Sequence, residues 1–145
     1  MELRRFVLQP WGMRSADDRP NLENWYRRYN EICNNHRFER LVDYVHPHVR
    51  VNGDVQGLDD YVSGLESVVA AFPDYRWDLQ HLVVNGDWLA AHFIDSGRHL
   101  GTFLGVAPSG RRIETQEFAF YRVSTGRIVE VWVAADNLRL LGQIR

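Results

Sequence analysis

Residues 113–135 read IETQEFAFYRVSTGRIVEVWVAA, and this stretch decides the fold of the chain. β-Branched and aromatic residues, which favour strands, are frequent on both sides of the triplet Ser124-Thr125-Gly126. The triplet itself is typical of a turn. The stretch therefore predicts two antiparallel strands over residues 113–123 and 128–135, joined by this turn.

The residues upstream extend the sheet. Two further strands are predicted over residues 77–84 and 88–98, because the Asn85-Gly86 pair between them is a strong signal for a tight hairpin turn. Residues 101–110 contain three glycines and one proline, which predicts a loop before the third long strand. The four strands together form an antiparallel meander.

Helical periodicity precedes the strands. Apolar side chains at spacings of three and four predict a first helix that begins near Asn21, a good N-cap, and ends near residue 34. A second short helix carries Val42 and Val45 on its apolar face and stops before residue 47. A third helix is predicted over residues 58–72, where the apolar residues form one stripe.

These elements make an α+β domain in which three N-terminal helices pack on one face of a curved, mostly antiparallel sheet of four to six strands. A short strand around residues 49–51 and a helical turn around residues 138–141 complete the domain. Residues 1–20 show no clear period, and we expect them to form an arm. A single domain then spans residues 21–145.

Composition excludes several classes of protein. The 145 residues carry 17 basic and 19 acidic side chains with a net charge of −2, which argues against nucleic acid or an anionic membrane as partner. No stretch reaches the roughly 18 apolar residues of a spanning helix. The N-terminus lacks the apolar run of a signal peptide, so we expect a cytoplasmic protein.

The one cysteine, Cys33, excludes a disulfide framework and a zinc cluster. It lies on the apolar face of the first predicted helix, which predicts a buried thiol.

A family resemblance rests mainly on residues 97–132. Residues 97–110 read GRHLGTFLGVAPSG and are followed by RRIETQEFAFYRVSTGRIVEVW, and His46-Pro47 and Phe72-Pro73 add to the pattern. Over roughly residues 24–144 the chain resembles the SnoaL-like polyketide cyclases, or ester cyclases, of the nuclear-transport-factor-2-like superfamily. The resemblance implies a cone-shaped domain that holds a hydrophobic small molecule in its mouth, needs no cofactor and forms a homodimer.

The resemblance also implies a reaction, an aldol ring closure in which a carboxylate transfers protons. The position of that acid falls on Val133, the neighbouring polar position on Val131, and a histidine of the third strand on Ala119. All three residues are apolar in this chain. The proton-transfer residues of the family are therefore not carried over.

Strand pairing offers a replacement for the missing acid. A hairpin centred on residue 106 sets Asp95 across from Glu117, and a turn centred on residue 125 sets Glu117 across from Val133. Because side chains alternate between faces, His99 shares the inner face with them. Two adjacent carboxylates in an apolar cone cannot both ionise cheaply, so one should keep a proton near neutral pH. The predicted catalytic residues are Glu117 or Asp95 as acid/base, with His99 orienting the substrate or stabilising an oxyanion.

A structural interpretation of the same pair stays open, because Glu117 could instead pair with Arg98 or Arg112 at the rim of the sheet. The residues expected to touch a ligand lie on the inner face of the sheet or on the helix that covers it. They are Trp25, Tyr29, Phe93, Ala119, Tyr121, Val131 and Val133.

The remaining polar residues predict no metal site. His46 and His48 flank residue 47 in a predicted loop, where a metal ion would need a third ligand. His92 should face away from the cone. Asp136 either caps the last helix or takes part in the chemistry.

Two hypotheses of different class follow. The first is a cofactor-free enzyme that cyclises, isomerises or ring-opens a hydrophobic, oxygenated small molecule. The second is a binding module that only holds an apolar ligand, or that dimerises through the outer face of its sheet. The valines at positions 131 and 133 favour the second hypothesis, and the pair Asp95–Glu117 favours the first. For the outer face, the sequence predicts an apolar patch of Phe118, Phe120, Ile128 and Trp132.

Overall fold

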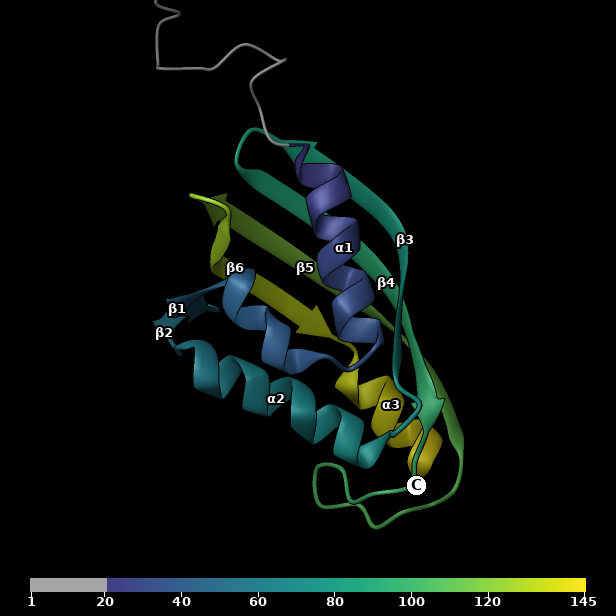
Figure 1. The fold of residues 1–145 in the computed structure, drawn as a ribbon. Helices are drawn as coiled ribbons and strands as arrows, with labels where there is room; N and C mark the ends of the chain where they lie inside the picture. Colours follow the sequence, from purple (N-terminus) through teal and green to yellow (C-terminus); the bar gives the residue numbers. More distant parts are fainter. Residues whose placement is uncertain (1–20) are drawn as a thin grey trace, which may run out of the picture.

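Ten elements follow one another in residues 21–145, which are the residues that this computed structural model describes (Figure 1). The predicted arm over residues 1–20 lies outside them. The elements are α1 (Leu22–Asn34), the 3₁₀ helix η2 (Phe38–Asp43), β1 (Val45–Val51), β2 (Asp54–Val55), α2 (Leu58–Ala71), β3 (Arg76–Asn85), β4 (Trp88–Arg98), β5 (Arg112–Ser124), β6 (Arg127–Ala135) and α3 (Asn137–Ile144).

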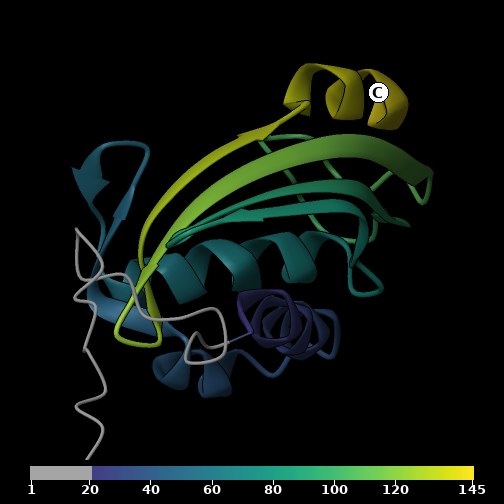
Figure 2. The same cartoon turned by 90° about the horizontal axis from the view of Figure 1, so that it is seen from above.

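The strands form one curved six-stranded sheet in the order β2-β1-β6-β5-β4-β3. All neighbours pair antiparallel except β1 and β6, which are parallel. Figure 2 shows the long strands arching over α1 and α2, so that both helices lie under the concave face. The predicted α+β class, with helices on one face of the sheet, is confirmed.

The helix ends follow the predicted capping chemistry. The Asn21 side chain accepts a hydrogen bond from the backbone N–H of Asn24 at 3.1 Å, which caps α1. The Asp136 side chain accepts one from the backbone N–H of Arg139 at 3.1 Å, which caps α3. Capping therefore accounts for Asp136.

The predicted second helix and the loop after it are wrong in detail. The segment is a 3₁₀ helix that ends at Asp43, and the side chain of Val42 is 49% exposed. Val45 is buried, but it begins β1, and His46 and His48 lie in that strand rather than in a loop. Pro47 has no N–H to donate, and the pairing of β1 with β6 is irregular between Val45 and Arg50.

The predicted strand register is wrong by two residues in both hairpins. Asp95 lies opposite Thr115, and Glu117 lies opposite Phe93 on one side and Ala135 on the other. The tip of the β4–β5 connection is Leu104-Gly105, both with positive φ, and not residue 106.

The β5–β6 register has a separate cause. Its turn is the two-residue Thr125-Gly126, and a bulge at Val129 then adds one residue to β6. Because the period of a strand is two, a shift of two keeps the paired side chains of β4, of β5 and of β6 beyond the bulge on their predicted faces, whereas Ile128, before the bulge, changes face.

The core lies between the concave face and the helices. The fully buried residues include Tyr26, Leu41, Phe72, Leu89 and Ile128. Towards one end of the sheet, α3 packs beside the start of β5, where Gln143 exchanges hydrogen bonds with the backbone of Glu114. None of the helices in the described part of the chain is long and apolar enough to cross a membrane.

Candidate functional site

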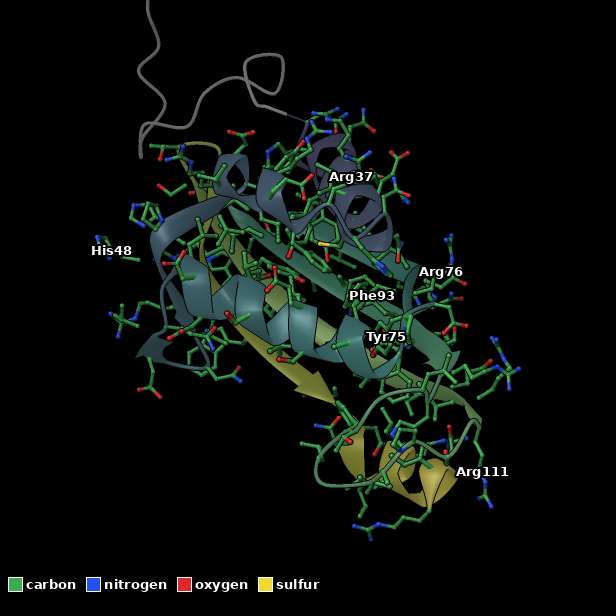
Figure 3. The ribbon with its side chains drawn as sticks, turned by 60° about the horizontal axis from the view of Figure 1, so that its bottom comes forward. Arg37, His48, Tyr75, Arg76, Phe93 and Arg111 are labelled. Atoms are coloured by element: carbon green, nitrogen blue, oxygen red, sulfur yellow. The ribbon has the colours of Figure 1, made fainter. Side chains whose placement is uncertain are left out.

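A cavity of about 180 Å³ lies between the concave face of the sheet and the helices α1 and α2. An engineered protein cavity of about 150 Å³ holds one benzene molecule, so this cavity holds at least one ring of a ligand. The residues that line it are Tyr26, Tyr29, Asn30, Cys33, Val51, Gln56, Asp60, Tyr61, Gly64, Leu65, Trp77, Phe93, Glu117, Tyr121, Val131 and Val133. In Figure 3, Phe93 and Tyr75 lie in the interior beneath α2, whereas Arg76 and Arg111 lie at the periphery.

Strand alternation brings Glu117 into this cavity. Residues 117, 119 and 121 of β5 share the concave face, and Phe93 is the direct neighbour of Glu117 on β4. Asp95 is the diagonal neighbour, because its direct partner is Thr115. Diagonal neighbours are within reach of a long side chain, so Glu117 still meets the Asp95 carboxyl.

Asp95 is completely buried in the wall behind the cavity. The Tyr75 hydroxyl donates a hydrogen bond to its Oδ2 at 2.9 Å, while Oδ1 has no hydrogen-bond partner among the described residues. Burial raises the pKa of Asp95 to about 6, and the hydrogen bond from Tyr75 limits that rise. A buried acceptor without a hydrogen-bond donor lowers the stability of the fold, so a donor to Oδ1 would be stabilising.

A protonated Glu117 carboxyl would be such a donor. Burial, followed by the charge of Asp95, raises the pKa of Glu117 well above its usual range. Neither carboxylate forms an ion pair with any described residue, and Arg112 instead pairs with Asp74 at 3.7 Å. The rim pairing considered from the sequence is therefore absent. The pKa values of both carboxyls are therefore raised, and the two groups of such a coupled pair lose their protons in two steps that belong to the pair.

Four tyrosines surround the other side of the cavity. The Tyr26 hydroxyl donates to the Tyr121 hydroxyl at 3.1 Å, and the hydroxyls of Tyr29 and Tyr61 share a hydrogen bond of 2.5 Å. Burial raises the pKa of all four well above 10. They remain protonated hydrogen-bond donors over the whole pH range in which the protein would work.

Cys33 is buried in the same wall, as its position on α1 predicts. Burial raises the pKa of its thiol to about 12. A thiol that stays protonated at neutral pH is a poor nucleophile. Cys33 is therefore part of the apolar lining.

His99 lies away from the cavity, and it is not among the residues that line it. The side chain is completely buried and packs against Phe72, with 5.4 Å between the ring centroids. Its Nδ1 accepts a hydrogen bond from the backbone N–H of Ser109 at 3.1 Å, so the neutral ring carries its proton on Nε2. The prediction that His99 orients a substrate gains no support from this geometry.

Five of the seven predicted ligand contacts line the cavity: Tyr29, Phe93, Tyr121, Val131 and Val133. Trp25 stacks on Tyr29 from behind, with 6.3 Å between the ring centroids, and Ala119 is buried on the same strand face. The positions of the family acid and of its neighbour, Val133 and Val131, thus lie in the wall and make it apolar.

Sequence reasoning missed several lining residues, above all Tyr61 and Trp77. Tyr61 belongs to an apolar helical stripe, which indicates core packing as readily as a cavity wall. It also missed Tyr75, which holds Asp95 from a connection between α2 and β3. No periodic signal marks that position.

The outer face of the sheet carries exposed aromatic side chains. Phe118 is 55% exposed, and Phe120 and Trp132 are each 45% exposed, as predicted. Ile128 is fully buried, so its predicted place on this face is wrong, and the bulge at Val129 is the reason. His92 faces outward, where it accepts or donates a hydrogen bond with His81 at 3.0 Å and contacts Gln116.

Comparisons with known proteins agree with one another. The sequence model of the SnoaL-like polyketide cyclases matches residues 23–144. The aklanonic acid methyl ester cyclase AcmA of Streptomyces galilaeus is 25% identical over 108 residues, which cover 70% of this chain and 75% of AcmA.

Solved structures give the same picture. A SnoaL-like polyketide cyclase of Agrobacterium tumefaciens is 28% identical with a TM-score of 0.78, covering 88% of this chain and 100% of its own. IdmH of Streptomyces antibioticus is 26% identical with a TM-score of 0.77, covering 86% of this chain and 98% of its own.

Proposed function

This chain belongs to the SnoaL-like polyketide cyclase family, and from that premise we propose that it is a cofactor-free enzyme of the cyclase type. Its substrate is a hydrophobic, oxygenated small molecule with an acidic C–H group next to a carbonyl. The observation that carries the proposal is the buried pair of Glu117 and Asp95 at a mostly apolar cavity.

Glu117 is the residue of the pair that touches the substrate, because it lines the cavity and Asp95 does not. The other carboxylate of the lining, Asp60, is an exposed residue of α2. Glu117 lies on β5, diagonal to Val133 on β6, since Ala119 is the direct partner of Val133. A carboxylate from the neighbouring strand thus takes over the place where the family acid would be.

The proposed step keeps protons and electrons balanced. The free oxygen of Glu117 takes a proton from the substrate carbon, and the electron pair of that C–H bond becomes an enolate. The proton already lying between the carboxyls passes to Asp95. When the enolate carbon attacks a second carbonyl, the new alkoxide takes a proton back from the pair. General acid–base catalysis of this kind contributes about 10²- to 10⁴-fold in rate.

Solvent exchange tests this function without knowledge of the natural substrate. The probe is 2-tetralone, a small two-ring ketone with acidic hydrogens next to its carbonyl. In D₂O at neutral pD, the wild-type protein should speed the replacement of these hydrogens by deuterium, followed by ¹H NMR. A wild-type protein that binds 2-tetralone and leaves its exchange rate at the solvent value would contradict the proposal and favour the binding module.

We further propose that a second copy of this chain covers the outer face of the sheet. Phe118 and Phe120 form a ridge on β5, and the small residues Ala90 and Ala134 lie on the strands at either side. A shallow hollow of about 540 Å³ includes all four positions. The ridge of one copy fits the hollow of another, and a symmetric dimer needs such a self-complementary surface.

Charge insertion tests this dimer. Phe118→Glu should raise the dimer dissociation constant by about 100-fold or more, because it would bury an unpaired charge at the centre of the interface. Analytical ultracentrifugation measures the change. Leu138→Glu is the matched control, because Leu138 is an 84% exposed residue of α3 outside this face. A wild-type protein that sediments as a monomer at tens of micromolar would refute the dimer.

A further inference from the structure

We propose that the tyrosines of the cavity form a binding site for a carbonyl oxygen, with the Tyr121 hydroxyl as its principal donor. The ligand class that follows is a ketone or ester whose carbonyl oxygen meets Tyr121 while its acidic carbon meets Glu117. This inference rests on the proposed function, since it describes the other half of the same cavity.

Proton counting supports Tyr121 as the donor. Two hydroxyl groups carry two protons, and a hydrogen bond between them involves only one of these protons. In the first pair Tyr26 donates and Tyr121 accepts, at 3.1 Å. With Tyr26 as the donor, the proton of Tyr121 is free, and its hydroxyl forms no other hydrogen bond with the described residues.

The second pair adds another donor. The hydroxyls of Tyr29 and Tyr61 share one hydrogen bond in which either atom can donate, so one proton of this pair is also not used between them. Both residues line the same cavity as Tyr121. A free O–H group that is buried in an apolar wall gains most from an acceptor that a ligand brings.

The placement on β5 directs both groups at one ligand. Tyr121 follows Glu117 by four residues on the same strand face, and the small residue Ala119 lies between them. Both side chains line the same cavity, so one ligand can contact both of them.

The donors also suit the charge that forms during the proposed step. Removing the C–H proton moves negative charge onto the carbonyl oxygen. Fixed O–H donors in a water-poor site stabilise that charge without reorganising, which is the main contribution of an oxyanion site. Tyr121 would therefore contact the reacting oxygen directly.

Binding, and not turnover, is the test. The probes are 2-tetralone and 2-methylenetetralin, which have the same shape but differ in the carbonyl oxygen. We expect the wild-type protein to bind the ketone at least 10-fold more tightly than the hydrocarbon. Tyr121→Phe should reduce this preference by about fivefold or more, the worth of one hydrogen bond to a buried group. In Tyr121→Phe, the infrared carbonyl stretch of bound 2-tetralone should also shift from its value in the wild-type complex towards its value in an apolar solvent.

Tyr44→Phe is the matched control, because Tyr44 packs against Tyr29 but is not among the residues that line the cavity. The preference of this variant for the ketone should stay within about twofold of the wild type. The inference fails if Tyr121→Phe keeps the wild-type preference, if Tyr44→Phe loses as much, or if 2-tetralone does not bind.

The two proposals can fail separately. Glu117→Gln should keep the preference for the ketone, because the variant retains Tyr121 and the assay involves no proton transfer. A wild-type protein with the preference but without deuterium exchange would refute the acid–base function and leave the carbonyl site standing. A wild-type protein that catalyses deuterium exchange but does not prefer the ketone would refute the carbonyl site and leave the acid–base function standing.

Discussion

Glu117→Gln should lower the rate of deuterium exchange into 2-tetralone by about 10²- to 10⁴-fold, the usual contribution of a general acid–base group. The glutamine amide keeps the size of the side chain and can donate to the unpaired Oδ1 of Asp95. It cannot accept a proton from carbon. The loss should therefore fall on the rate, while the dissociation constant for the ketone changes little.

The same substitution should stabilise the folded protein above pH 6. Burial raises the folded-state pKa of Glu117 above its unfolded value near 4, so folding favours the protonated form. The wild type thus loses stability as pH rises from about 4 through the folded pKa values. Glu117→Gln removes that loss, and its unfolding midpoint at pH 8 should lie roughly 3 °C or more above that of the wild type.

Thermal unfolding at pH 4 and pH 8 measures the effect. The unfolding temperatures of the two proteins should differ least at pH 4, where Glu117 is protonated in the folded state and mostly protonated in the unfolded state. Thr115, the direct neighbour of Asp95, provides a control in Thr115→Val, which leaves both carboxyls in place. The opposite result would be a Glu117→Gln protein that loses stability relative to the wild type between pH 4 and pH 8. It would mean that Glu117 is ionised in a stabilising contact.

Gly101→Ala should destabilise the fold by about 2–4 kcal/mol, a large effect for one methyl group. A Cβ at this position would lie 2.4 Å from the carbonyl oxygen of Ala70 and 3.0 Å from the Cα of Ala71. Both are backbone atoms of the last turn of α2 and cannot move aside cheaply. The clash would also disturb the hydrogen bonds from the backbone N–H groups of Leu100 and Gly101 to Ala71.

Chemical unfolding measures that loss, and Gly142→Ala is the matched control. Gly142 lies in α3, and a Cβ there would meet no atom within 4 Å. Alanine favours a helix over glycine by about 1 kcal/mol, so the control should be as stable as the wild type or more stable. A Gly101→Ala protein with wild-type stability would show that α2 does not pack against this connection as described.

Much of the fold was predictable because its signals are local. The period of the apolar residues and the capping side chain of Asn21 fix the long helices, and the turn residues fix the hairpins. Register was not predictable, because it depends on where a connection reverses and on a bulge such as that at Val129. These are features of backbone geometry that many residues can adopt.

The candidate site was predictable only in part, for a related reason. Face follows from strand parity, so Glu117 and Tyr121 were placed on the inner face despite the wrong register. Distance across strands does not follow from parity. The contact between Glu117 and Asp95 survives a shift of two residues only because a glutamate is long enough to reach diagonally. The partners from helices and connections, Tyr61 and Tyr75, needed the three-dimensional structure.

A carboxyl titration by NMR shows whether Asp95 and Glu117 share a proton near neutral pH. With ¹³C-labelled side chains, both carboxyls should titrate well above the usual value of about 4, with Asp95 near pH 6. In Tyr75→Phe the lower of these two steps should rise further, because ionised Asp95 loses a donor. If both carboxyls of the wild type titrate near 4, they do not share a proton in an apolar cavity, and the acid–base function falls with them.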